Sequence, residues 1–140
     1  MTERHNHSIP VSYVDKGKDA TVCWNSQDFK FKNSTEYPIY IIAELSSDKR
    51  VHVDVYGLLL PDGMTIKVEA ELTETVDFEI EKEPSPFLAK GEKVILKEGR
   101  TGYKAQAYKL YYDRDGNLID RKLLCKSVYP AQNRVVQYGE

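Results

Sequence analysis

Two alternating runs of apolar and polar residues, set between glycine-containing turns, fill the last forty residues and constrain the fold most strongly. Residues 103–112 and 118–128 flank a turn at Asp115-Gly116, and Gly99 and Gly102 precede the first run. Period-two alternation bounded by turn residues is typical of β-strands, whereas a helix needs a period near 3.6. Because no helical periodicity of useful length occurs anywhere in the chain, we predict an all-β fold.

The strictest alternation lies in residues 68–81, where apolar residues hold most even positions and acidic residues most odd ones. This pattern predicts one or two long strands with one apolar and one acidic face, ended by Pro84-Ser85-Pro86. Within residues 103–112 the apolar positions change from odd to even numbers, which predicts a β-bulge near Ala107.

Residues 1–60 indicate a separate small unit. Residues 39–45 and 51–57 are apolar runs around a polar loop, which predicts a hairpin. Pro61-Asp62-Gly63 is a turn that opens the second unit, residues 61–140. Shorter apolar–polar alternations occur upstream of the hairpin, at residues 9–13, 20–22 and 29–31.

The composition is that of a folded protein, with 41% hydrophobic and 30% charged residues. The net charge of -2 argues against bulk nucleic-acid binding. Cys23 and Cys125 lack the spacing of a metal or redox motif, so we predict neither. The sequence shows no signal peptide and no apolar run long enough to span a membrane. We therefore expect a cytosolic protein or, as we favour, a piece of a longer polypeptide.

Charges are segregated along the second unit. Residues 67–92 contain eight acidic and three basic residues, whereas residues 93–140 contain ten basic and five acidic residues. One interpretation is that adjacent strands pair opposite charges across a sheet. The other is a basic face that binds an anionic wall polymer.

The second unit, about residues 67–139, resembles the bacterial G-five domain. The resemblance is carried by the Gly99/Gly102 joint, the paired runs around Asp115-Gly116, and the closing Arg134-Val135-Val136 with Gly139. It implies an elongated, nearly single-layer fold in which two small sheets are joined by an extended, triple-helix-like crossing. It also implies an extracellular, Gram-positive setting and a module that binds N-acetylglucosamine-containing glycans or acts as a stalk.

The first unit resembles the C-terminal end of the VanW-like family, which is associated with vancomycin resistance. The matching blocks are residues 3–8, 10–14, 17–22, 28–33 and 37–41, continuing to Tyr56-Gly57. The family normally places a longer region with a cysteine-bearing, glycine-rich segment before these blocks. The two resemblances together imply two small antiparallel β modules, extracellular or associated with the cell wall, with a signal or anchor expected upstream.

His5 and His7 are the candidates for catalysis or metal binding. They stand two residues apart, so in an extended segment both imidazoles point the same way. Two ligands do not complete a zinc site, which usually needs three or four. We predict no cofactor, with zinc at this pair as the alternative. If a cysteine upstream is a nucleophile, as the resemblance allows, one of the two histidines could act as its base.

Tyrosines and cations of the long strands are the candidates for glycan binding. Flat aromatic rings suit the C–H surface of a pyranose, and strands can present such rings in rows. The aromatic candidates are Tyr103, Tyr108, Tyr111, Tyr112 and Tyr129, with Trp24 in the first unit; the cations are Lys104, Lys109, Arg121 and Lys122. The alternative is that these tyrosines simply cover a thin sheet that has no second layer.

The function predicted for the chain is non-catalytic binding or display at peptidoglycan or another cell-wall glycan. One alternative is a part of a cysteine/histidine enzyme that modifies peptidoglycan, with its cysteine upstream. Another is a mechanical spacer or self-associating stalk, since exposed strand edges would allow a homodimer. We expect no catalysis by this chain alone.

Overall fold

The computed structural model describes residues 1–140 and contains strands, loops and one short 3-10 helix, so the all-β prediction is confirmed. The elements are β1 (Tyr40–Leu45), β2 (Val51–Tyr56), η1 (Pro61–Gly63), β3 (Thr65–Val76), β4 (Ile80–Pro84), β5 (Lys93–Lys97), β6 (Gly102–Tyr112), β7 (Leu118–Tyr129) and β8 (Arg134–Tyr138). From β1 onward, the strands lie where the alternation predicted them.

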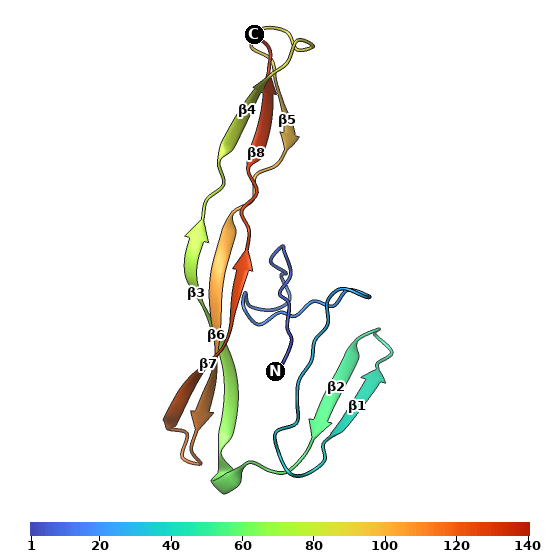
Figure 1. The fold of residues 1–140 in the computed structure, drawn as a ribbon, viewed down its shortest axis with the longest axis vertical. Coiled ribbons are helices and arrows are strands. Elements are labelled where there is room, and N and C mark those ends of the chain that lie inside the picture. Colours follow the sequence, from blue (N-terminus) through green and yellow to red (C-terminus); the bar gives the residue numbers. More distant parts are fainter.

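Two three-stranded sheets placed end to end give the second unit its elongated shape (Figure 1). The central sheet, in the order β3-β6-β7, is antiparallel throughout. The distal sheet, in the order β4-β8-β5, departs from the antiparallel prediction because β4 runs parallel to β8. Parallel partners need a long connection, and here that connection contains β5, β6 and β7. No second sheet covers either of them (Figure 1).

Three extended segments cross between the central and distal sheets, as the G-five resemblance implied (Figure 1). They are residues 77–79, 98–101 and 130–133. Arg100 and Gln132 exchange two backbone hydrogen bonds of 2.8 Å, and the Arg134 amide donates to the Glu79 carbonyl at 2.8 Å. These bonds hold the crossing strands together where the sheets are interrupted.

Glycine is required at this crossing because side chains would collide with neighbouring strands. A Cβ at Gly102 would lie 2.7 Å from the Tyr129 carbonyl oxygen and nearer still to the Ala131 amide. A Cβ at Gly99 would lie 2.7 Å from Cγ of Phe78 and nearer still to two other carbons of its ring. The glycine joint is therefore set by close approach between the segments.

A register shift occurs between β6 and β7 at the predicted position. Ala107 pairs with Cys125, but the next residue, Tyr108, pairs with Leu123, which leaves Leu124 unmatched. The extra residue thus belongs to β7, and the bulge lies opposite Ala107.

The buried side chains of β6 lie on both faces of the central sheet. Ala105 and Ala107 are buried on one face and Leu110 on the other. Across the sheet, Leu110 is flanked by Lys67 and Arg121. Strand β6 continues unbroken against β3 at this point. The switch from odd-numbered to even-numbered apolar residues therefore reflects a switch in which face of β6 is buried, from the face of the alanines to the face of Leu110.

The first thirty-one residues form an irregular segment with no strand, although apolar alternation occurs there. Its backbone is held by isolated antiparallel bridges, Glu3 with Lys30, His5 with Thr21 and Cys23 with Gln27. The alternating stretches at 9–13 and 29–31 have no partner strand long enough to form a ladder. The segment instead lies beside the central sheet (Figure 1).

The β1–β2 hairpin forms as predicted and contacts no other strand. Alternation gives it one face that is entirely aliphatic, made by Ile41, Ala43, Leu45, Val51, Val53 and Val55. This face is uncovered, with Val53 57% exposed. A two-stranded hairpin alone is marginally stable, so the loop Ser46–Arg50 contributes through bonds from the Ser46 amide to the Arg50 carbonyl (2.8 Å) and from Ser46 Oγ to the same carbonyl (2.9 Å).

Substituting Gly102 tests the crossing. We expect Gly102→Ala to lower the unfolding free energy of the second unit by about 2 kcal/mol, because backbone atoms cannot move aside for a new Cβ. Gly57→Ala is the matched control, since its Cβ would meet only the Ile39 side chain, at 3.2 Å. Urea titration followed by tyrosine fluorescence reports both values, and equal midpoints for the two variants would contradict this account of the joint.

Candidate functional site

A buried polar cluster forms where the N-terminal segment meets the central sheet. The Arg4 guanidinium donates to the Asp19 carbonyl (2.8 Å), to Ser127 Oγ (3.0 Å) and to the Gly17 carbonyl (3.1 Å). The Tyr129 hydroxyl donates to the Asp19 carboxylate and accepts a 2.7 Å bond from the Gly17 amide. The first unit is thereby joined to strand β7 by buried hydrogen bonds.

Most of the buried residues of the molecule gather around this cluster. Of the ten buried residues, Gly17, Asp19, Ala105, Ala107, Ser127 and Tyr129 all belong to it. A Cβ at Gly17 would lie 3.1 Å from the Ala105 Cβ. Small residues on both sides therefore allow the backbone of the segment to lie directly on the sheet.

The Asp19 carboxylate is the electrostatic centre of the cluster. Burial alone would raise its pKa, but hydrogen bonds from Tyr129 and His7 outweigh burial, so the pKa of Asp19 lies below its ordinary value. Burial and the hydrogen bond to Asp19 together raise the pKa of Tyr129. Arg4 Nη2 lies 3.5 Å from Asp19 Oδ1 and balances the buried negative charge.

His7 is held by the same carboxylate. Its backbone amide (2.8 Å) and its Nδ1 (2.9 Å) both meet Asp19 Oδ2. An ionised carboxylate only accepts hydrogen bonds, so in the neutral imidazole Nδ1 carries the proton and Nε2 holds the free lone pair. The His7 side chain is 28% exposed, against 1% for Asp19. The buried carboxylate therefore orients the imidazole ring, while part of the ring stays accessible to solvent.

An open groove of about 420 Å³ runs past this ring and is lined by Arg4, His5, His7, Thr21 and Pro130 among others. His5 does not join the Asp19 cluster, because its Nε2 lies 3.2 Å from Glu3 Oε1 instead. The two predicted histidines therefore engage different carboxylates. No group of three or more His, Cys, Asp or Glu side chains is placed to hold a metal ion.

The six predicted glycan-binding residues divide between the two faces of the central sheet. Tyr108, Tyr112, Lys104 and Arg121 lie on the face that buries Leu110. Tyr103 and Tyr111 lie on the opposite face, which carries the buried alanines. Parity separates the two faces of a strand, but the bulge predicted near Ala107 would have placed Tyr103 on the face of Tyr108 and Tyr112, whereas β6 continues unbroken there.

Each of these four tyrosine rings has a cation over it. The pairs are Arg121 over Tyr108 at 3.6 Å, Lys16 over Tyr103 at 4.5 Å, and Lys67 over Tyr112 and Lys122 over Tyr111 at 5.2 Å each. Arg121 also meets Glu71 at 2.9 Å and Lys104 meets Glu74 at 2.7 Å. In the central sheet, cross-strand charge pairing is thus confirmed.

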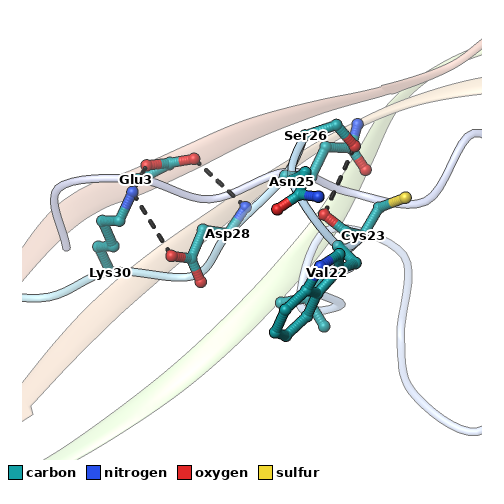
Figure 2. A pocket seen from close by; sticks show the side chains of 9 residues that line it. Glu3, Val22, Cys23, Asn25, Ser26, Asp28 and Lys30 are labelled. Atoms are coloured by element: carbon teal, nitrogen blue, oxygen red, sulfur yellow. Dashed lines mark hydrogen bonds and ion pairs between the residues drawn. The ribbon is translucent and has the colours of Figure 1, made fainter.

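Two other aromatic candidates lie elsewhere. Tyr129 is wrong as a sugar-stacking residue, because its side chain is buried in the Asp19 cluster. Trp24 is 91% exposed and lines an open pocket of about 600 Å³ in a loop where Asn25 has a positive φ of 63°. In the same pocket, Lys30 Nζ donates to Glu3 Oε2 at 2.7 Å (Figure 2).

The family comparisons agree with the two-part structure. Residues 67–140, more than half of the chain, match the family described as G5 domain. The chain belongs to the G5 domain family. Residues 1–56 match the family described as VanW like protein. Both domain types are typical of cell-envelope proteins, and the structure contains no helix with the length and hydropathy needed to cross a membrane.

Relatives of the G5 chain were found by sequence and by structure. The uncharacterized protein YoaR of Bacillus subtilis (strain 168) is 43% identical over 44 residues, which are 31% of this chain and 14% of YoaR. The chain thus spans a small part of that relative's length. An IgA1 protease G5 domain structure (23% identity, TM-score 0.45) covers 55% of this chain and 89% of its own. The match to the crystal structure of HP0197-G5 (28% identity, TM-score 0.34) covers 54% of this chain and 97% of the HP0197-G5 chain.

The Asp19 cluster makes the stability of this G5 chain sensitive to acid. Because the pKa of Asp19 is lowered in the folded state, its contribution is fully present above the ordinary aspartate pKa of about 3.9 and is lost as pH falls through the lower folded value. We expect the unfolding free energies of wild type and Asp19→Asn to differ at neutral pH and to converge as pH falls through the lowered pKa of Asp19. The exposed Asp48→Asn is the control; a wild-type advantage over Asp19→Asn that persists undiminished in acid would contradict this role.

Proposed function

We propose that this chain is a cell-envelope module that binds an extended peptidoglycan-type glycan along one face of its central sheet. The supporting observation is the row formed by Tyr108 and Tyr112 with the cations Arg121 and Lys67. The row lies on the face opposite the N-terminal segment, so the segment does not cover it. It forms a half-exposed surface rather than a closed cavity.

The chemistry of this row suits a linear sugar polymer. Aromatic rings and the guanidinium plane present flat surfaces to the C–H faces of pyranose rings. Gln106, which accepts a 2.6 Å bond from the Tyr108 hydroxyl, and Lys67 supply polar groups for hydroxyl and acetamido groups. Contacts of this kind are individually weak, and binding gains strength when modules or sites are repeated. The expectation of N-acetylglucosamine follows from the G5 resemblance.

Tyr112 and Tyr111 give a matched test, because they are neighbours on opposite faces and each has a lysine 5.2 Å from its ring. We expect Tyr112→Ala to reduce retention of the chain on insoluble peptidoglycan about tenfold. This is the size of effect seen when one aromatic side chain that stacks on a nucleic-acid base is removed. Tyr111→Ala should bind like wild type. Equal losses in the two variants, or no retention of wild type, would overturn the proposal.

A second candidate function rests on the His7–Asp19 pair. A histidine whose Nδ1 is held by a buried carboxylate and whose Nε2 is free has the geometry of a general base paired with its orienting acid. In the enzyme alternative, an upstream cysteine would give its thiol proton to Nε2, and the thiolate would attack a peptide carbonyl of peptidoglycan. The peptide C–N bond would then break to leave a thioester on the cysteine, and the leaving amine would take the proton from Nε2. His7, not His5, is the base in this proposal.

The test of this candidate uses a polypeptide in which a cysteine-bearing segment of the VanW-like type precedes these residues. We expect His7→Gln to lower the rate of peptide-bond exchange on muropeptides by about a hundredfold or more, and His5→Gln to have little effect. Imidazole ¹⁵N shifts give an independent readout, since Asp19→Asn should lose the fixed Nδ1–H tautomer of His7. An active His7→Gln variant would exclude the base.

A further inference from the structure

The distal sheet sorts its charges by face. Strand β4 alternates Ile80, Glu81, Lys82 and Glu83, so lysine and glutamate point to opposite sides. The register with β8 and β5 places Lys82, Arg134 and Lys93 on a common face, while Glu81 and Glu83 lie on the other. One face of a thin sheet is therefore basic although the strand itself is acidic overall.

The basic face contains an open groove of about 740 Å³. None of the nine lining residues is acidic. The floor is apolar, made by Ile80, Ile95, Val136 and Tyr138. Ile80 is 55% exposed and Ile95 is 48% exposed, so water covers aliphatic surface that a ligand could bury.

The cations of this groove lack the partners that cations of the central sheet have. Lys82 and Lys93 form no ion pair within the chain, whereas Lys104 and Arg121 each meet a glutamate across the central sheet. Arg134 reaches Glu98 with Nη2 at 2.9 Å, but its buried Nε has no acceptor. Positive charge on this face is thus largely unbalanced.

We infer that the basic face of the distal sheet binds a linear polyol-phosphate polymer. Lys82 and Lys93 lie on the outer strands, about 10 Å apart across the sheet, so they suit successive charges of one chain rather than a single anion. A phosphodiester carries its charge within its backbone, so the carbon atoms between two phosphates can lie on the apolar floor. The carboxylates of a polyacid project away from its backbone, which would hold that backbone off the floor. A polyanion as dense as nucleic acid is disfavoured by the net charge of -2.

This site is distinct from the tyrosine row of the central sheet. It lies at the far end of the molecule from the hairpin and the N-terminal segment (Figure 1). The two ligands also differ, since one is a sugar polymer recognised by rings and the other a polyanion recognised by charge. Failure of one proposal therefore leaves the other standing.

The test uses the whole chain and a fluorescent glycerol-phosphate oligomer. We expect saturable binding by anisotropy that weakens with salt, and about a tenfold or greater loss in Lys82→Gln/Lys93→Gln. The control Lys49→Gln/Lys126→Gln makes the same change in net charge at exposed lysines outside the groove and should bind like wild type. Tyr112→Ala should also bind like wild type.

Three outcomes would overturn the inference. They are no binding by wild type, equal loss in the two double-lysine variants, and equally tight binding of a polyglutamate of the same charge. The first would show that the face does not bind polyanions, the second that net charge alone acts, and the third that phosphate is not selected.

Discussion

The buried carboxylate of Asp19 is the interaction on which the arrangement of the two units depends. It receives hydrogen bonds from Tyr129 of strand β7 and from His7 of the N-terminal segment, while Arg4 supplies the opposite charge. Removing one partner would leave a buried charge or donor unsatisfied, which costs far more than a surface ion pair. The cluster fixes the segment to the sheet and orients His7 in the same step.

Thinness is the second constraint on this molecule. A sheet with no covering layer buries few side chains. Its core consists of alanines, a serine and Tyr129 beside the N-terminal segment, and of Leu110 on the other face. Elsewhere, cations laid over tyrosine rings and cross-strand ion pairs replace a second layer. Those interactions leave long, half-exposed faces, and such faces suit linear polymers better than small molecules, which prefer concave sites.

The sequence was informative where the signal was local. Alternation and turn residues predicted β3 to β8 and the hairpin, since these depend on period and on Gly or Pro. The bulge was predicted at the right position but in the wrong strand, because its extra residue, Leu124, belongs to β7. Sequence could not show that β4 would run parallel to β8, because pairing partners are set by the path of the whole chain. The cluster of Arg4, Asp19 and Tyr129 was missed because Tyr129 lies more than a hundred positions from the other two, and no sequence pattern links it to them. In the sequence, Tyr129 resembles the other tyrosines of the long strands. Only its hydrogen bonds with Gly17 and Asp19 distinguish it from them.

Hydrogen exchange at the Gly17 amide tests the central claim most directly, because that amide donates to the Tyr129 hydroxyl only when the two units are joined. The account predicts strong protection of Gly17 at neutral pH, comparable to that of amides within β6, and loss of that protection in Tyr129→Phe while β6 stays protected. Exchange of Gly17 at the rate of an unstructured peptide in the wild-type chain would contradict it, because the N-terminal segment would then not be held on the sheet.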